Sequence, residues 1–148
     1  MADILILHGP NLNMLGIRQP ELYGHETLKQ LNTQLEEVAK LNHVTLDIFQ
    51  HNAEHELIDK IHQAYLNTKL VIINPAGFTH TSVALKDALL SIALPYIEVH
   101  LSNIYARESY RQSSLFSDKA IGVISGFGTQ SYTLALLAAC RHLITCTE

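Results

Sequence analysis

Short apolar runs recur along the chain, separated by longer stretches in which apolar and polar positions mix. Residues 4–7 and 70–73 are unbroken runs of Ile, Leu and Val, which is the pattern of strands buried on both faces of a sheet. Residues 44–48 alternate apolar and polar side chains, so they predict a strand with one wetter face at a sheet edge. Residues 96–101 and 120–125 complete a set of five expected strands.

The stretches between these runs carry apolar residues at spacings of three and four, as on one face of a helix. Asn52 is an expected N-cap of the second helix, and Thr81 or Ser82 of the third. Residues 105–113 are polar and predict a short helix or an ordered loop. The apolar residues that mark the expected helices lie within residues 28–41, 57–65, 82–90 and 129–145.

Strands that alternate with helical connections imply a parallel sheet with helices on both faces. Five strands suit the order 2-1-3-4-5 of flavodoxin-like folds, with the second strand at the edge. The chain has no linker, internal repeat or low-complexity segment. We therefore expect one α/β domain over residues 1–148 with a flavodoxin-like three-layer fold.

Composition narrows the class of protein. Hydrophobic residues make up 47% of the chain and charged residues 16%, which is typical of a globular domain. The net charge of −4 argues against a general nucleic-acid binder but leaves room for a local cationic pocket. Cys140 and Cys146 both lie in the last helical stretch, which favours reduced thiols. Without a signal sequence or membrane-spanning run, the sequence predicts a soluble cytoplasmic protein with no nucleic-acid or membrane partner.

Polar residues collect where four of the expected strands end. The sequences there are HGPNLN from His8, NPAGFTH from Asn74, EVHLSN from Glu98 and SGFG from Ser125. The carboxyl ends of parallel strands meet at one edge of the sheet, and open α/β sheets bind their ligands there. We therefore expect a small-molecule site at this edge.

The loop after the first strand combines an arginine with a tyrosine. Arg18 lies five residues before Tyr23. A fixed positive charge favours the ionised form of a nearby phenol, which makes a tyrosine a usable base near neutral pH. Tyr23 is therefore a candidate general base.

A carboxylate and an imidazole share one face of the fourth expected strand. Glu98 and His100 are two residues apart, so their side chains leave the strand on the same side. Because two ionisable groups are costly to bury unless they pair, the carboxylate would hold one imidazole nitrogen and leave the other free to donate a proton. The alternative is a buried pair with a purely structural role.

Two arginines follow that strand. Arg107 and Arg111 are four residues apart and would share a face of a helix, from which Arg111 could reach substrate hydroxyls or a carboxylate. The alternative is a solvated pair, with Arg107 bound to the neighbouring Glu108.

Two further motifs are weak. The HxxEH pattern that begins at His51 resembles a zinc motif, but it crosses the expected strand-to-helix junction, so its histidines cannot share a helix face. The GxGxxS pattern at Gly126 lacks the third glycine of a dinucleotide loop and follows the last strand. The sequence therefore predicts neither a metal site nor a dinucleotide site.

With these motifs assembled, the chain resembles the type II 3-dehydroquinate dehydratases over essentially its whole length. The resemblance implies a flavodoxin-like fold without cofactor or metal, and an anti elimination through an enolate in the third step of the shikimate pathway. The matching motifs are HGPNLNMLGxRxPxxYG from His8 to Gly24, NPAGxxHTSVALxDA from Asn74 to Ala88, and EVHLSNIxxRExxR from Glu98 to Arg111.

The resemblance also implies catalytic roles. Tyr23, as a phenolate favoured by Arg18, would remove a proton from C2 of the substrate. Asn11, through a bound water, would stabilise the enolate. His100, held by Glu98, would protonate the departing C1 hydroxyl.

Substrate binding is implied in the same way. Asn74 and the backbone amides near Leu101 and Ser102 would bind the substrate carboxylate, while His80 and Arg111 would bind ring hydroxyls.

Assembly and loop motion complete what the resemblance implies. Asp87 would reach into the site of a neighbouring subunit within a homododecamer built from four trimers. The loop that carries Tyr23, with Gly16 and Gly24 as possible hinges, resembles the family's mobile lid.

Two other classes of protein share the expected topology. A flavin- or nucleotide-binding module would need a hydroxyl-rich phosphate loop after the first strand and aromatic residues around the ring. That loop here reads GPNLN, and the chain has no tryptophan. A receiver-like scaffold would need acidic residues at the carboxyl ends of the strands, whereas Asp3 lies at the opposite end of its strand.

Overall fold

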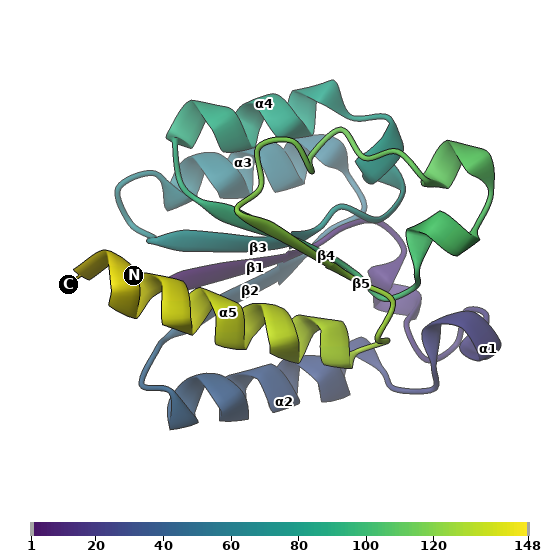
Figure 1. The fold of residues 1–148 in the computed structure, drawn as a ribbon, viewed down its shortest axis with the longest axis horizontal. Helices are drawn as coiled ribbons and strands as arrows, with labels where there is room; N and C mark the ends of the chain where they lie inside the picture. Colours follow the sequence, from purple (N-terminus) through teal and green to yellow (C-terminus); the bar gives the residue numbers. More distant parts are fainter. Residues whose placement is uncertain (1, 148) are drawn as a thin grey trace.

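The computed structural model of the protein describes residues 2–147 and places five parallel strands in one sheet (Figure 1). They are hydrogen-bonded in the order β2-β1-β3-β4-β5. The fold class and strand order predicted from the sequence are therefore confirmed, with β2 at the sheet edge. The strands are β1 (Ile4–His8), β2 (Leu46–Gln50), β3 (Leu70–Asn74), β4 (Tyr96–His100) and β5 (Gly122–Ser125).

Helices cover both faces of the sheet and give three layers. In Figure 1, α2 and α5 lie below the sheet, and α3 and α4 lie above it. A short helix, α1, stands apart beyond the carboxyl ends of the strands. The helices are α1 (Pro20–Tyr23), α2 (Leu28–Leu41), α3 (Glu54–Ala64), α4 (Val83–Ile92) and α5 (Gln130–Thr147).

Alternate side chains of β1 point to opposite faces of the sheet and pack into two separate hydrophobic cores. Ile4 and Ile6 point to the core shared with α2 and α5, while Leu5 and Leu7 point to the core shared with α3 and α4. All four side chains are at most 1% exposed, which explains why this strand reads as an unbroken apolar run. Burying each contributes about 1.5–3 kcal/mol relative to exposure.

One predicted helix cap is wrong. The N-cap of α3 is Ala53, and it has no side-chain hydrogen bond. The Oδ1 atom of Asn52 instead accepts hydrogen bonds from the backbone N–H of Asn11 at 2.9 Å and from Nε2 of Gln50 at 3.1 Å. Asn52 therefore ties the loop after β1 to the end of β2, a long-range contact that competes with capping.

The alternative caps of the third helix resolve in favour of Ser82. Its Oγ atom accepts a hydrogen bond from the backbone N–H of Leu85 at 2.9 Å. The polar segment 105–113 forms two separate 3-10 turns, η3 (Ile104–Ala106) and η4 (Ser109–Arg111). The predicted shared helix face of Arg107 and Arg111 is therefore wrong.

The loop after β1 is bound closely to the end of β3. The N–H of Gly9 donates to the carbonyl oxygen of Asn74 at 2.8 Å. A Cβ atom at Gly9 would lie 2.6 Å from the carbonyl oxygen of Pro75, so only glycine permits this approach.

Within residues 2–147, no helix is long and apolar enough to cross a membrane.

Candidate active site

A cavity opens at the carboxyl ends of β1, β3 and β4, where the sequence predicts a site. Its walls come from the loop after β1, the turn after β3, and the segment after β4 that carries η3 and η4. Eight of the eleven predicted site residues are among those that line it. The lining residues are Pro10, Leu12, Arg18, Tyr23, Asn74, Ala76, Gly77, His80, His100, Leu101, Ser102, Ile104, Arg107 and Arg111.

Two arginines flank the phenol of Tyr23. The guanidinium carbon of Arg18 lies 4.9 Å from the centre of the Tyr23 ring, and that of Arg107 lies 5.4 Å from it. Both cations are attracted to the electron-rich face of the ring. The pairing of Arg18 with Tyr23 fits the prediction, whereas the position of Arg107 does not follow from sequence spacing.

Backbone conformation brings Tyr23 over the cavity. Gly16 has a φ of +88°, and a Cβ atom there would lie 2.8 Å from the carbonyl oxygen of His25. Pro20 begins α1, where its fixed φ suits the first helical position, and Gly24 ends it with a φ of +88°. The two glycines therefore turn the chain on either side of the tyrosine.

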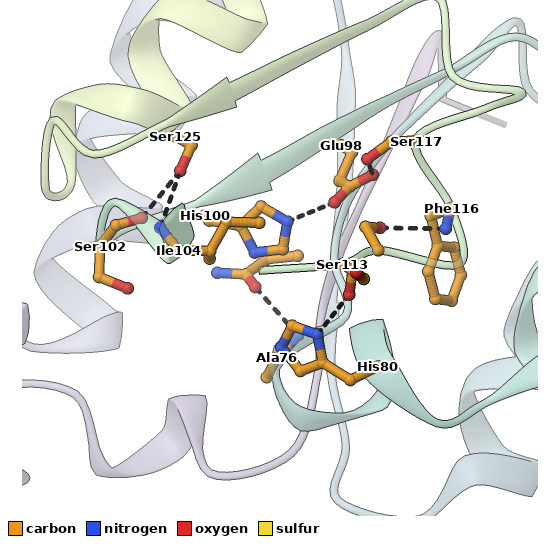
Figure 2. A network of polar contacts seen from close by, with 12 residues as sticks. Ala76, His80, Glu98, His100, Ser102, Ile104, Ser113, Phe116, Ser117 and Ser125 are labelled. Carbon is orange, nitrogen blue, oxygen red and sulfur yellow. Dashed lines mark hydrogen bonds and ion pairs between the residues drawn. The ribbon is translucent and has the colours of Figure 1, made fainter. Parts of the chain in front are cut away.

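Glu98 and His100 form the predicted pair on β4 (Figure 2). Glu98 is fully buried, and Nε2 of His100 is hydrogen-bonded to its Oε2. Ser117 donates to the other carboxylate oxygen at 2.7 Å. Burial alone would raise the pKa of the Glu98 carboxyl, but the hydrogen bond and charge of His100 outweigh it and hold that pKa below its usual value. The carboxylate therefore stays ionised, and Nδ1 of His100 is left for proton exchange.

The turn after β3 presents an amide and a second imidazole. Oδ1 of Asn74 accepts from the backbone N–H of Ala76 at 3.1 Å, which leaves the amide nitrogen as its donor. Nδ1 of His80 lies 2.7 Å from the carbonyl oxygen of Ser113 (Figure 2). Because a carbonyl only accepts, Nδ1 of His80 carries a proton and donates it to Ser113.

The segment after β4 is anchored from β5. Oγ of Ser125 donates to the carbonyl oxygen of Ser102 at 2.9 Å and lies 3.5 Å from the backbone N of Ile104 (Figure 2). Leu101 and Ser102 are buried against the cavity wall. The β5 side chain therefore fixes the turn that carries both residues.

Glu108 connects the two arginines of this segment. Its Oε2 lies 2.9 Å from Nε of Arg111, an ion pair without hydrogen-bond geometry at that nitrogen, and 3.9 Å from Nε of Arg107. Both arginine side chains are largely buried, at 13% and 22% exposure, so they are not the solvated pair of the alternative interpretation.

Three predicted residues do not line the cavity. Glu98 is fully buried and is hydrogen-bonded to His100, which does line the cavity. Asn11 is exposed, in the left-handed conformation at a φ of 71°, between the two lining residues Pro10 and Leu12. Asp87 is exposed on α4. The predicted roles of Asn11 and Asp87 therefore stay predictions.

His8 is a buried group for which the sequence suggested no role. It is fully buried at the end of β1, with Nδ1 2.8 Å from the hydroxyl of Tyr132 and Nε2 2.8 Å from Oδ1 of Asn32. Burial lowers the pKa of His8 to about 4, so the imidazole is neutral at pH 7.

Acidification is expected to destabilise the fold through His8. In the unfolded chain its pKa returns to 6.5, so the unfolded state takes up a proton before the folded state does. The stability that neutral His8 contributes is therefore complete above pH 6.5 and is lost as the pH falls toward about 4, by about 3 kcal/mol. Urea unfolding as a function of pH measures this loss.

His8→Asn supplies the control for acid destabilisation. Other groups titrate in the same range, so the contribution of His8 is the difference in slope between the wild type and this variant. A variant that loses stability with pH as steeply as the wild type would contradict the assignment.

The predicted interruption of the HxxEH pattern is confirmed. His51 precedes α3, its Nδ1 accepts from the backbone N–H of Ala53 at 2.9 Å, and the helix begins at Glu54. The histidines at the two ends of the motif therefore do not share a helix face. Among residues 2–147, no three His, Cys, Asp or Glu side chains are grouped so as to bind a metal ion.

Known proteins resemble this chain along most of its length. The 3-dehydroquinate dehydratase of Photobacterium profundum is 60% identical over 140 residues, covering 95% of this chain and 93% of that protein. The 3-dehydroquinate dehydratase of Hahella chejuensis is also 60% identical over 140 residues, covering 94% of this chain and 95% of that protein.

Solved structures agree in fold. The type II dehydroquinase of Butyrivibrio crossotus superposes with a TM-score of 0.90 at 40% identity, covering 93% of this chain and 96% of that one. The family model described as dehydroquinase class II matches residues 2–140. The chain therefore belongs to the type II dehydroquinase family, as its motifs predicted.

Proposed function

We propose that this chain dehydrates 3-dehydroquinate to 3-dehydroshikimate, the third step of the shikimate pathway, by an anti elimination through an enolate. The observation that carries the proposal is one cavity that combines a tyrosine between two arginines with a carboxylate-held histidine. The names of the relatives supply the substrate.

The first step is removal of a proton from C2, next to the substrate ketone. Tyr23, as a phenolate, takes that proton, and the electron pair of the C–H bond moves into the enolate. Arg18 and Arg107 lie over the ring and favour the phenolate that the step needs. Asn11 stabilises the enolate oxygen through a bound water.

The second step is loss of the C1 hydroxyl. The enolate collapses, the C1–O bond breaks, and His100 gives the leaving oxygen a proton so that it departs as water. Glu98 stabilises the imidazolium that donates this proton and orients the ring through Nε2. The net reaction releases one water and needs no cofactor. It leaves Tyr23 protonated and His100 short of one proton, and proton exchange with solvent returns both groups to their starting states.

Binding groups lie around the same cavity. Asn74 and the backbone amides near Leu101 and Ser102 bind the substrate carboxylate. His80, through its free Nε2, and Arg111 bind ring hydroxyls. These contacts orient C2 toward Tyr23 and C1 toward His100.

The proposal extends to assembly and location. Asp87 is exposed on α4 and therefore available to a neighbouring subunit, and the assembly is a homododecamer of four trimers. The enzyme works in the cytoplasm, and the loop with Tyr23 closes over bound substrate.

Ultraviolet absorbance on mixing the protein with 3-dehydroquinate tests the proposed activity. The product is a conjugated enone, so a growing absorption band reports the elimination directly. A protein that binds flavin or a nucleotide and leaves 3-dehydroquinate unchanged would overturn the proposal in favour of a binding module.

A further inference from the structure

The turn after β5 is hydrogen-bonded to the end of β4 through two backbone contacts. The N–H of Gly126 donates to the carbonyl oxygen of His100 at 3.3 Å, and the N–H of Gly128 donates to the carbonyl oxygen of Leu101 at 2.9 Å. In a regular strand, two successive carbonyl groups point to opposite neighbours. Here both accept from the β5 side, so the strand pattern ends at His100.

Ser125 adds a third contact of the same kind. Its Oγ atom donates to the carbonyl oxygen of Ser102 at 2.9 Å and lies 3.5 Å from the backbone N of Ile104 (Figure 2). Ser125 lies in register with His100, so its side chain is placed beside the residues that follow β4. Of the three contacts, this one depends on a side chain, so substitution at Ser125 removes it and leaves the two glycine contacts in place.

Three carbonyl groups that point to one side turn three N–H groups to the other. No peptide bond among residues 2–147 is cis, and a trans peptide is planar with its C=O and N–H on opposite sides. The N–H groups of Leu101, Ser102 and Asn103 therefore point away from β5. Within the described part of the chain, those of Leu101 and Ser102 have no hydrogen-bond partner.

The cavity lies on the side to which these N–H groups point. In the sheet, β4 has β5 on one side and β3 on the other, and the turn after β3 forms part of the cavity wall. Leu101 and Ser102 line the same cavity, together with three arginines. Successive backbone N–H groups that point the same way form a concave site for an anion.

We propose that Ser125 is a positioning residue that holds the N–H groups of Leu101 and Ser102 toward the substrate carboxylate. This rests on the proposed function, in which those amides bind that carboxylate. Ser102 stands between two peptide groups, one held by the N–H of Gly128 and the other by Oγ of Ser125. Both contacts are needed to fix the two backbone torsions of Ser102 and thus the shape of the turn.

Ser125→Ala is the first test. Because the carboxylate is bound equally in the ground state and in the transition state, KM for 3-dehydroquinate is expected to rise about fivefold while kcat stays within about twofold. Thermal unfolding reports the stability of the variant separately from KM. A KM that equals the wild-type value in the folded variant would overturn the inference.

Two further serine variants are matched to this test. Ser125→Thr keeps the hydroxyl and is expected to keep KM within about twofold of the wild type, since threonine suits a strand. Ser91→Ala removes a similar hydrogen bond, from Oγ to the carbonyl oxygen of Ala88 at 2.7 Å on α4, outside the cavity, and is expected to leave KM unchanged. A rise in KM with either variant as large as with Ser125→Ala would refute the role of the Ser125 hydroxyl.

A pair of inhibitors tests whether the effect is confined to the carboxylate. Reduction of the substrate ketone to an alcohol removes the acidity of C2, so the reduced compound binds without eliminating, and its carboxamide lacks the negative charge. Ser125→Ala is expected to raise the inhibition constant of the carboxylate about fivefold and to leave that of the carboxamide within about twofold. Equal changes for both compounds would mean that Ser125 shapes the cavity in general and does not position the carboxylate site.

The wild-type protein distinguishes the two levels of the argument. A wild type that does not convert 3-dehydroquinate refutes the proposed function. An active wild type whose KM is unaffected by Ser125→Ala refutes only the positioning role of Ser125.

Discussion

Tyr23→Phe is expected to lower kcat for the dehydration of 3-dehydroquinate by about 10²–10⁴-fold. The substitution removes only the phenolic oxygen, so the ring keeps its contacts with Arg18 and Arg107. The variant therefore keeps the shape of the cavity and loses the base. Product absorbance under saturating substrate measures the effect.

Tyr65→Phe is the matched control for this prediction. Tyr65 is 54% exposed at the C-cap of α3, outside the cavity, so the loss of its hydroxyl should leave kcat unchanged. If Tyr23→Phe turned over as fast as the control, Tyr23 would not be the base, although the enzyme activity itself would stand.

Sequence alone predicted the sheet because the signal for each strand is local. The runs at Ile4 and Leu70 are apolar on both faces, and only a strand between two helix layers satisfies that pattern. The carboxyl ends of such strands then place the site. The Glu98–His100 pair could be predicted because residues two apart on a strand point to the same face, and this relation does not depend on the rest of the fold.

What the sequence did not reveal depends on contacts between distant segments. Asn52 was a plausible helix cap, but its side chain accepts a hydrogen bond from the backbone N–H of Asn11, 41 residues away. The sequence offered the pairing of Arg107 with the neighbouring Glu108 as an alternative, and the two lie 3.9 Å apart, but the position of Arg107 over Tyr23 depends on the fold of two loops. The contact of His8 with Tyr132 spans 124 residues, and no local pattern predicts it.

These contacts share one physical basis. Polar side chains at the carboxyl edge are buried beside a cavity, so each needs a hydrogen-bond partner within the protein. His100 is held by Glu98 on the same strand, Asn74 by the backbone N–H of Ala76 in the turn that follows it, and His80 by the carbonyl oxygen of Ser113 in the segment after β4. A site built in this way is expected to be sensitive to substitutions that never touch substrate.

Glu98→Gln is the second substitution with a large expected effect, a fall in kcat of about 10²–10³-fold. Glutamine fits the same space, but it lacks the charge that stabilises the imidazolium of His100, so proton donation to the leaving hydroxyl becomes harder. Ser117→Ala is the control, because it removes the hydrogen bond to Oε1 and keeps the carboxylate. A loss with Ser117→Ala as large as with Glu98→Gln would show that packing around the carboxyl, and not its charge, sustains activity.

The same variant is expected to change how stability depends on pH. The pKa of Glu98 is held below its ordinary value of 4.5, so the folded state binds fewer protons than the unfolded state as the pH falls. The ionised carboxylate therefore contributes stability that is complete above about pH 4.5 and is lost below it. The difference in unfolding free energy between the wild type and Glu98→Gln, measured in urea, should be largest near neutral pH and should shrink below about pH 4.5. A difference that stays constant with pH would mean that the Glu98–His100 pair adds no charge-dependent stability, and its catalytic role would then have to rest on the orientation of His100 alone.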